Sequence, residues 1–94
     1  MASLNQRQVE AFRAVMMAGG ITSAARLLNV TQPAVSRLIR DLQAAMRLKL
    51  FERQGTRLLP TSEALSLYTE VERSFVGLDR ILQAAADLGA RRAG

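Results

Sequence analysis

The sequence predicts a mainly α-helical domain that carries one short β-hairpin and continues into a long C-terminal helix. Three observations support this fold class. Apolar residues recur at helical spacing in three segments before residue 47. The periodicity then changes over residues 48–59, where two short apolar runs flank Gly55. From residue 61 to residue 88, apolar residues recur every seven positions, as they do in helices that pack along a seam.

The composition is basic and lacks the residues that most catalytic and metal sites need. The 94 residues include 13 Lys and Arg against 8 Asp and Glu, a net charge of +5, and Lys49 is the only lysine. Arg suits phosphates and base edges because its planar guanidinium donates in a fork; the alternative is a charge that only favours solubility. With no Cys, no His and scattered carboxylates, we expect no cofactor, no metal and no enzyme activity.

No segment has the pattern of a signal peptide or a membrane span. Residues 1–20 lack an unbroken apolar core because Arg7, Glu10 and Arg13 interrupt them. No apolar run approaches the ~20 residues that a transmembrane helix needs. We therefore expect a soluble, cytoplasmic protein without a membrane partner.

The first expected helix covers residues 5–18. Asn5 can cap its N-terminus, and Gln8 completes a capping-box pattern three residues on. Gly19 and Gly20 end it, because glycine readily adopts the left-handed conformation that stops a helix. Its apolar residues share one face, which we expect to lie in the core: Val9, Phe12, Val15 and Met16.

Two further helices are expected on either side of a tight turn. Thr22 is expected to cap the first, which runs to about Leu28, and Asn29 can take up positive φ in the turn. Thr31 then caps a helix over residues 32–46. The expected buried stripe of this helix comprises Val35, Leu38, Ile39, Leu42 and Met46. The spacing predicts a helix-turn-helix, and the alternative is an ordinary helical hairpin.

The helix over residues 32–46 exposes a polar face at its N-terminal end. Gln32, Ser36 and Arg40 form one row, four residues apart, and Arg37 lies in the adjacent row. In helix-turn-helix proteins this end enters the major groove, where Gln can pair with adenine and Arg with guanine. We predict that Gln32, Ser36 and Arg37 read bases and that Arg40 contacts the backbone. The alternative is a face that is only hydrated.

The two runs around Gly55 predict a β-hairpin that serves as a wing. Its strands are expected at residues 48–53 and 57–59, with Leu50 and Leu58 facing the helices. Pro60 then ends the hairpin, because proline cannot donate to a strand ladder. The alternative is a connector without a binding role.

Five further residues are expected to contact the DNA backbone or the minor groove. Arg53, Gln54 and Arg57 surround the tip of the wing, close to the basic face of the preceding helix. Thr22 and Thr31 stand at helix N-termini, and the backbone N–H groups at such ends suit phosphate oxygens. The alternative for the wing arginines is simple solvation.

A linker helix is expected from residue 61 to residue 88, after a DNA-binding domain at residues 1–60. Thr61 can cap it, and its seven-residue repeat predicts packing on a second copy of the chain; the alternative is packing on its own domain. Residues 89–94 are expected to form a frayed tail. The predicted dimer interface comprises Ala64, Tyr68, Val71, Phe75, Leu78, Leu82 and Ala85.

These segments resemble the N-terminal DNA-binding domain and linker helix of LysR-type transcriptional regulators. The resemblance rests on QVEAFRAV (8–15), ITSAARLLNVTQPAVSRLIRDL (21–42), LKLFERQGTRLLPT (48–61) and the helix that follows. It implies a winged helix-turn-helix that dimerises through its linker helices in a bacterial regulator. The positions in that family that approach bases correspond to Gln32, Pro33, Ser36 and Arg37, and those near the backbone or minor groove to Thr31 and Arg53.

Three positions depart from the pattern of this family. Arg47 stands where a Gly often ends the third helix, so this turn is expected to be strained or reshaped. Gln43 stands where Glu is usual, and Ala64 replaces a Gly that is common early in the linker helix. The family also carries a C-terminal effector domain, so we expect this chain to be a fragment of a longer protein. On that expectation a small-molecule inducer binds only in the missing domain, and the full-length parent is a dimer or a tetramer.

The function that these observations predict is sequence-specific DNA binding by a transcription regulator. Two recognition helices, one from each copy in a homodimer, would enter successive major grooves of an inverted repeat in double-stranded DNA. The alternatives are a helical protein-interaction module and a non-specific architectural DNA-binding protein. Salt-dependent duplex binding distinguishes the first alternative, and a preference between sites distinguishes the second.

Overall fold

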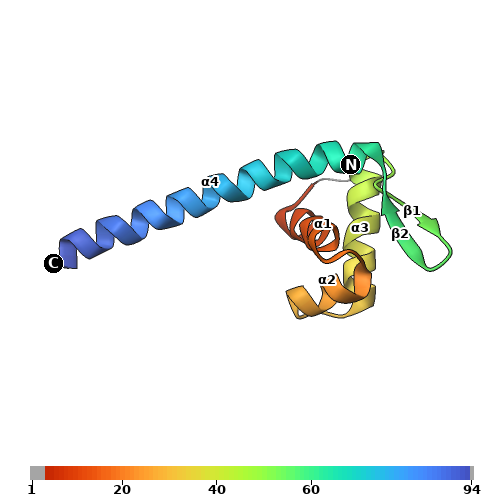
Figure 1. The fold of residues 1–94 in the computed structure, drawn as a ribbon, viewed down its shortest axis with the longest axis horizontal. Coiled ribbons are helices and arrows are strands. Elements are labelled where there is room, and N and C mark those ends of the chain that lie inside the picture. Colours follow the sequence, from red (N-terminus) through yellow and green to blue (C-terminus); the bar gives the residue numbers. More distant parts are fainter. Residues whose placement is uncertain (1–3, 94) are drawn as a thin grey trace.

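A computed structural model describes residues 4–93 and confirms the predicted fold class. The elements, in chain order, are α1 (Gln6–Ala18), α2 (Ile21–Leu28), α3 (Gln32–Met46), β1 (Phe51–Gln54), β2 (Arg57–Pro60) and α4 (Ser62–Ala93). The first three helices and the hairpin gather into a body, and α4 crosses this body and extends far beyond it (Figure 1). The molecule therefore measures 57 × 27 × 24 Å.

The ends of α1 and α3 follow the predicted capping chemistry. The Asn5 side chain accepts the N–H of Gln8, 2.9 Å away, and the Gln8 side chain accepts the N–H of Asn5. Gly19 ends α1 in the left-handed conformation at φ 87°. The Thr31 hydroxyl accepts the N–H of Ala34 at the start of α3. These local signals were sufficient to place both helices.

The predicted cap of α2 is wrong. This helix begins at Ile21, and Gly20, two residues before Thr22, occupies the N-cap position without any side-chain hydrogen bond. The Gly20 carbonyl accepts the N–H of Ala24, so the first helical hydrogen bond precedes Thr22 and leaves this threonine exposed in the first turn. Asn29 ends α2 with φ 57° and ψ 47°, the left-handed conformation that the sequence predicted.

The core lies where α1, α2, α3 and the start of the wing meet under α4. Phe12 is its centre, with ring centroids 5.9 Å from Phe51 and 6.4 Å from Tyr68. Alanines on α1 and α2 are fully or almost fully buried, which lets the helix backbones approach closely. The buried apolar set comprises Ala11, Phe12, Ala14, Val15, Ala24, Ala25, Val35, Ile39, Leu42, Leu50, Phe51, Ala64 and Val71.

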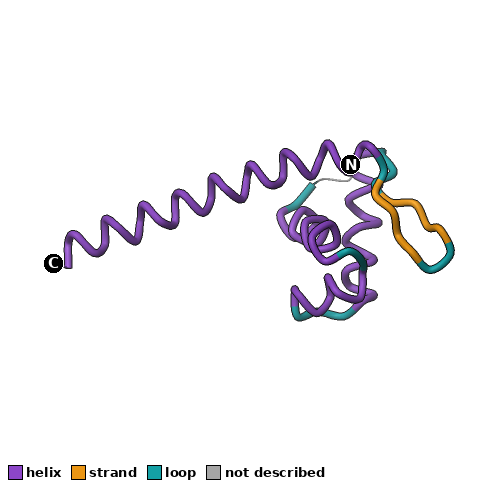
Figure 2. The backbone as a smooth tube through the Cα atoms, in the orientation of Figure 1, coloured by secondary structure: helices purple, strands orange, loops and turns teal. Residues whose placement is uncertain are grey.

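The wing is a two-stranded antiparallel sheet with a two-residue turn (Figure 2). Phe51 pairs with Pro60 and Gln54 with Arg57, and Gly55 in the turn has φ 59°. Its first strand starts at Phe51 rather than at residue 48, because the residues before it are tied to the helices instead of to a second strand. Leu50 is fully buried and Leu58 half-buried, as the sequence predicted.

The base of the wing is tied to both neighbouring helices. The Gln43 side-chain oxygen accepts the N–H groups of Leu50 and Phe51, at 2.8 and 3.2 Å. The Thr61 hydroxyl donates to the Lys49 carbonyl at 2.7 Å and accepts the N–H of Ala64, which caps α4. The Gln43 and Thr61 side chains therefore tie the base of the hairpin to the end of α3 and to the start of α4.

The extent of α4 corrects the predicted boundary. The helix continues through residue 93, whereas the sequence was expected to fray after Leu88. Ala and Arg dominate this last turn, and both favour helix strongly enough to offset the single interior Gly89.

Arg47 ends α3 with φ 55° and ψ 38°, which is the left-handed conformation. This conformation is unfavourable for residues other than glycine, so the backbone strain predicted at this position is located at Arg47.

Candidate nucleic-acid interface

A cleft of about 420 Å³ brings together parts of the chain that are far apart in sequence. Its walls come from the turn between α1 and α2, the first turns of α2 and α3, and the wing. Predicted contact residues line it, namely Thr22, Gln32, Ser36, Arg53 and Arg57. The cleft therefore unites residues predicted separately from the two helices and from the hairpin.

The start of α3 presents unoccupied polar groups. Gln32, Pro33 and Arg37 are exposed, and Ser36 is half-buried at the edge of the cleft. Within residues 4–93, no side-chain hydrogen bond or salt bridge engages Gln32, Ser36 or Arg37. The Thr31 cap and Pro33 fix this end of the helix, so these side chains project from a defined backbone and can bond a ligand.

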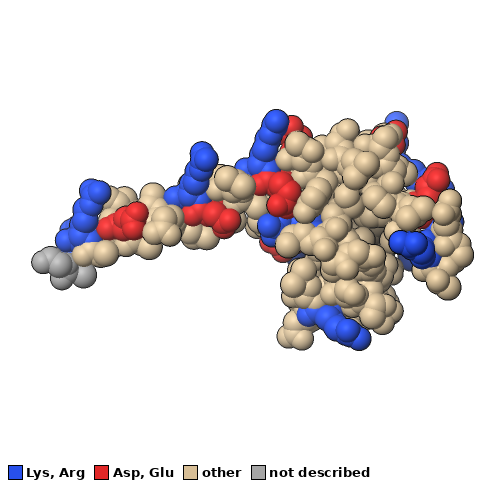
Figure 3. All heavy atoms as spheres, viewed as in Figure 1, with Lys and Arg blue, Asp and Glu red and all other residues tan. Residues whose placement is uncertain are grey.

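The electrostatics of the cleft favour an anion. Arg53 and Arg57 are its charged residues, and no Asp or Glu lines it among the described residues. The N-terminus of α2 opens into it with no side-chain cap, which leaves backbone N–H groups and the positive end of a helix dipole available. Figure 3 shows Lys and Arg side chains at the wing and at the end of the body where α2 and α3 meet.

The other residues predicted to contact the backbone, Thr31, Arg40 and Gln54, do not line the cleft. Arg40 is exposed on the same row as Gln32, about 12 Å further along α3. Gln54 is exposed at the wing tip. Thr31 and Arg26 line a second hollow, of about 380 Å³, at the turn between α2 and α3. Arg26 lies four residues after Thr22, on the same face of α2, and both residues line this hollow.

Two structural residues behind the site escaped the sequence reasoning. Gln43 was noted only as a departure from the family pattern, yet it holds the wing by two backbone hydrogen bonds. Arg13 was noted only as an interruption of an apolar run, yet its Nε donates to Glu72, 2.6 Å away and 59 residues later. Neither partner could be inferred from local spacing.

The residues predicted for the dimer interface fall into three groups. Ala64 and Val71 are buried in the body, so their assignment to the interface is wrong: they pack against the chain's own core. Tyr68 and Phe75 are half-buried and pack against the same core. From residue 76 to residue 92 the side chains of α4 are exposed; the three predicted interface residues there are Leu78, Leu82 and Ala85.

No three of the His, Cys, Asp and Glu side chains within residues 4–93 are grouped so that they could hold a metal ion. In the same residues, every helix is too short or too polar to cross a membrane.

A recognition helix, a wing and an Arg-lined cleft between them define a winged helix-turn-helix domain of the DNA-binding kind. The model of the bacterial regulatory helix-turn-helix proteins of the lysR family matches residues 6–65. The chain belongs to this family.

Relatives and solved structures support this assignment. OccR of Rhizobium meliloti, an octopine catabolism/uptake operon regulatory protein, is 57% identical over 91 residues, which are 97% of this chain and 31% of OccR. The transcriptional activator protein LysR of Escherichia coli K12 is 50% identical over 94 residues, all of this chain and 30% of LysR. The chain thus spans about 30% of these relatives. The CbnR DNA-binding domain in complex with DNA has a TM-score of 0.79 at 26% identity, covering 92% of this chain and 99% of that one.

Proposed function

We propose that this chain is the DNA-reading and dimerising part of a cytoplasmic bacterial transcription regulator. It would bind double-stranded DNA sequence-specifically by inserting the start of α3 into the major groove. The observation that carries the proposal is the set of exposed, unengaged Gln32, Ser36 and Arg37 side chains beside a cleft lined by Arg53 and Arg57. The regulatory names of OccR and LysR support the same class of function. We assign the chain no catalytic role.

The side chains divide into base-reading and positioning groups. Gln32 would pair with an adenine and Arg37 with a guanine, while Ser36 and Pro33 approach neighbouring bases. The positioning contacts to phosphates or the minor groove would come from Thr22, Thr31, Arg40, Arg53, Gln54 and Arg57. Arg53 and Arg57 line the cleft from the wing, opposite the start of α3. They would therefore contact the DNA backbone beside the major groove that α3 enters.

The partner of the outer half of α4 would be a second copy of the chain. Leu78 and Leu82 are 43% and 58% exposed and share a stripe with Ala85. Such a stripe on a helix that extends beyond its body favours burial against another helix. A two-fold dimer would present two reading helices to an inverted repeat. In a longer parent protein, inducer binding and further assembly would belong to residues outside this chain.

Selection of preferred duplexes from a random pool, followed by binding assays, tests the proposal. Arg37→Ala should cost about 1–3 kcal/mol on the selected site and relax the preference at one base position. Arg53→Ala should weaken binding to all sequences and reduce the salt slope by about one. Arg92→Ala, on the exposed end of α4, is the control and should change neither.

Three outcomes would contradict parts of this proposal. Equal loss on selected and scrambled DNA would reassign Arg37 from a base to a phosphate. Binding without any sequence preference would indicate an architectural DNA-binding protein. No salt-dependent binding at all would favour a protein-interaction module.

A further inference from the structure

Arg13, on α1, contacts α4 near the end of the stretch that packs against the body. Its Nε lies 2.6 Å from the Glu72 carboxylate, and its guanidinium carbon lies 4.1 Å from the centre of the Phe75 ring. Glu72 and Phe75 are three residues apart and share one face of α4. From residue 76 to residue 92, α4 has only exposed side chains.

The contact is suited to fixing an angle rather than to holding the fold together. Arg13 and Glu72 keep 30% and 36% of their side chains exposed, and exposed ion pairs contribute little to stability. The fold is held deeper, by Phe12 against Tyr68 and by buried Val71. The hydrogen bond to Glu72 raises the pKa of Arg13 above its ordinary value, so the guanidinium remains charged at any physiological pH.

The length of the outer helix amplifies any tilt at this point. From Phe75 to Ala93 the helix extends for about 27 Å, so a tilt of about 10° would displace its end by about 5 Å. One base-pair step of DNA is only about 3.4 Å. If two copies are joined through their outer helices, the angle between the body and α4, which Arg13 bridges, sets the position of one α3 relative to the other.

We infer that Arg13, by contacting Glu72 and Phe75, sets the angle of α4 and so determines which spacing between two half-sites the dimer accepts. Arg13 is then a positioning residue for specificity that never touches DNA. The inference rests on the proposed function, because spacing has a meaning only for a DNA-binding dimer.

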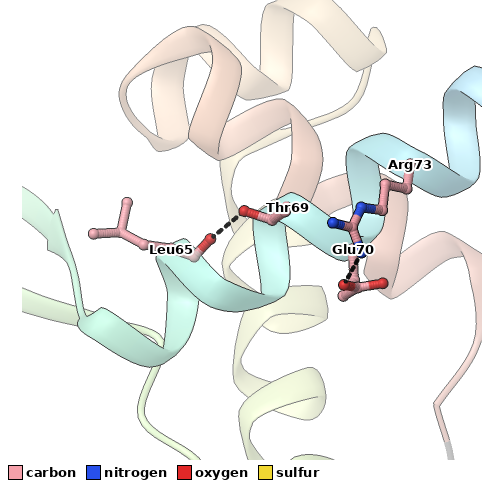
Figure 4. A network of polar contacts seen from close by, with 4 residues as sticks. All are labelled: Leu65, Thr69, Glu70 and Arg73. Atoms are coloured by element: carbon pink, nitrogen blue, oxygen red, sulfur yellow. Dashed lines mark hydrogen bonds and ion pairs between the residues drawn. The ribbon is translucent and has the colours of Figure 1, made fainter.

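Two variants and one matched control test this role. Arg13→Met removes the guanidinium but keeps an apolar chain over the ring, and Glu72→Gln removes the charge without altering the ring contact. Arg73→Met is the control, because Arg73 also pairs with a glutamate, Glu70, at 2.8 Å, but within α4 (Figure 4). All three should retain the wild-type melting temperature within about 5 °C.

The first readout is binding to duplexes that carry two selected half-sites with the spacer changed one base pair at a time. The wild-type chain and Arg73→Met should prefer one spacing by about tenfold over its neighbours. In Arg13→Met and Glu72→Gln this preference should fall to about threefold or less, with the base preference within each half-site unchanged. A purely stabilising role would leave the spacing preference intact.

The second readout needs no DNA. The chain has no cysteine, so Ala44→Cys, on the exposed side of α3, gives one spin label per copy. The distance between the two labels in a dimer should have a narrow distribution in the wild-type and Arg73→Met backgrounds and a broader one in the other two. Unchanged distributions and spacing preferences in both test variants would overturn the inference and leave the proposed function standing. The absence of any distance between labels in the wild-type background would overturn the dimer on which both depend.

Discussion

The inner half of α4, residues 62–75, and its outer half, residues 76–92, carry the same apolar repeat in different surroundings. In the inner half Ala64 is fully buried and Val71 is 6% exposed, because α1 and the hairpin cover them. In the outer half Leu82, which continues the same repeat, is 58% exposed, and no described element covers it. A seven-residue repeat thus identifies which face of a helix is apolar, but it does not identify what covers that face.

This difference changes which substitutions test the dimer. A charge at Phe75 would disturb both halves, since its ring packs on the core and under Arg13. Residues further out affect only the contact between copies. Two of the four predictions below concern α4 and two concern the end of α3, and each has a control substitution at the same or a nearby position.

The largest effect is expected for Val71→Asp in the inner half. It places an unpaired carboxylate in the core and should cost about 4 kcal/mol of the free energy of unfolding. Urea unfolding followed by circular dichroism measures the loss. Val76→Asp, on the same helix but 50% exposed, should cost less than about 1 kcal/mol. Similar losses at both positions would contradict the assignment of Val71 to the core.

The second effect is expected for Leu82→Asp in the outer half. Its charge enters a symmetric interface twice, so the dissociation constant of the dimer should rise about 100-fold, or about 3 kcal/mol. Sedimentation equilibrium measures the constant, while the body should remain folded. Ala84→Asp lies on the opposite side of the helix and should leave the dimer intact. An unchanged dimer in the Leu82 variant would remove this stripe from the interface.

The third effect concerns the tie between α3 and the wing within the body. Gln43→Leu leaves two backbone N–H groups without their acceptor and should cost about 2 kcal/mol. Gln43→Glu keeps an acceptor oxygen in place and should cost about 0.5 kcal/mol or less. Urea unfolding compares the two variants. A loss of equal size in both would mean that the hydrogen bonds do not carry the effect.

The smallest effect is a gain in stability at the end of α3. Arg47→Gly relieves a left-handed backbone conformation and should stabilise the body by about 1 kcal/mol. Arg47→Ala removes the same side chain without relieving the backbone and should give no comparable gain. Thermal unfolding measures both, and a gain shared by the two variants would attribute it to lost charge instead.

Much of the fold could be predicted because its signals are local. Asn5 with Gln8 and Thr31 with Pro33 set helix starts through hydrogen bonds within one turn, and Asn29 ends a helix through its own backbone. The cap at Thr22 was misplaced because Gly20 can cap without a side chain, and no residue pattern marks that choice. The end of α4 was misplaced because one glycine does not stop a helix.

The sequence by itself determined the helices, the hairpin and the polar face of α3, because each depends on residues within one or two turns. Only the tertiary structure decided that Arg53 and Arg57 face Gln32 and Ser36 across a cleft, and that Arg13 pairs with Glu72. It also decided that the inner half of α4 packs against the body of its own chain, whereas the outer half is exposed. These outcomes depend on contacts between segments tens of residues apart, where many pairings satisfy the same local pattern and only close packing selects one.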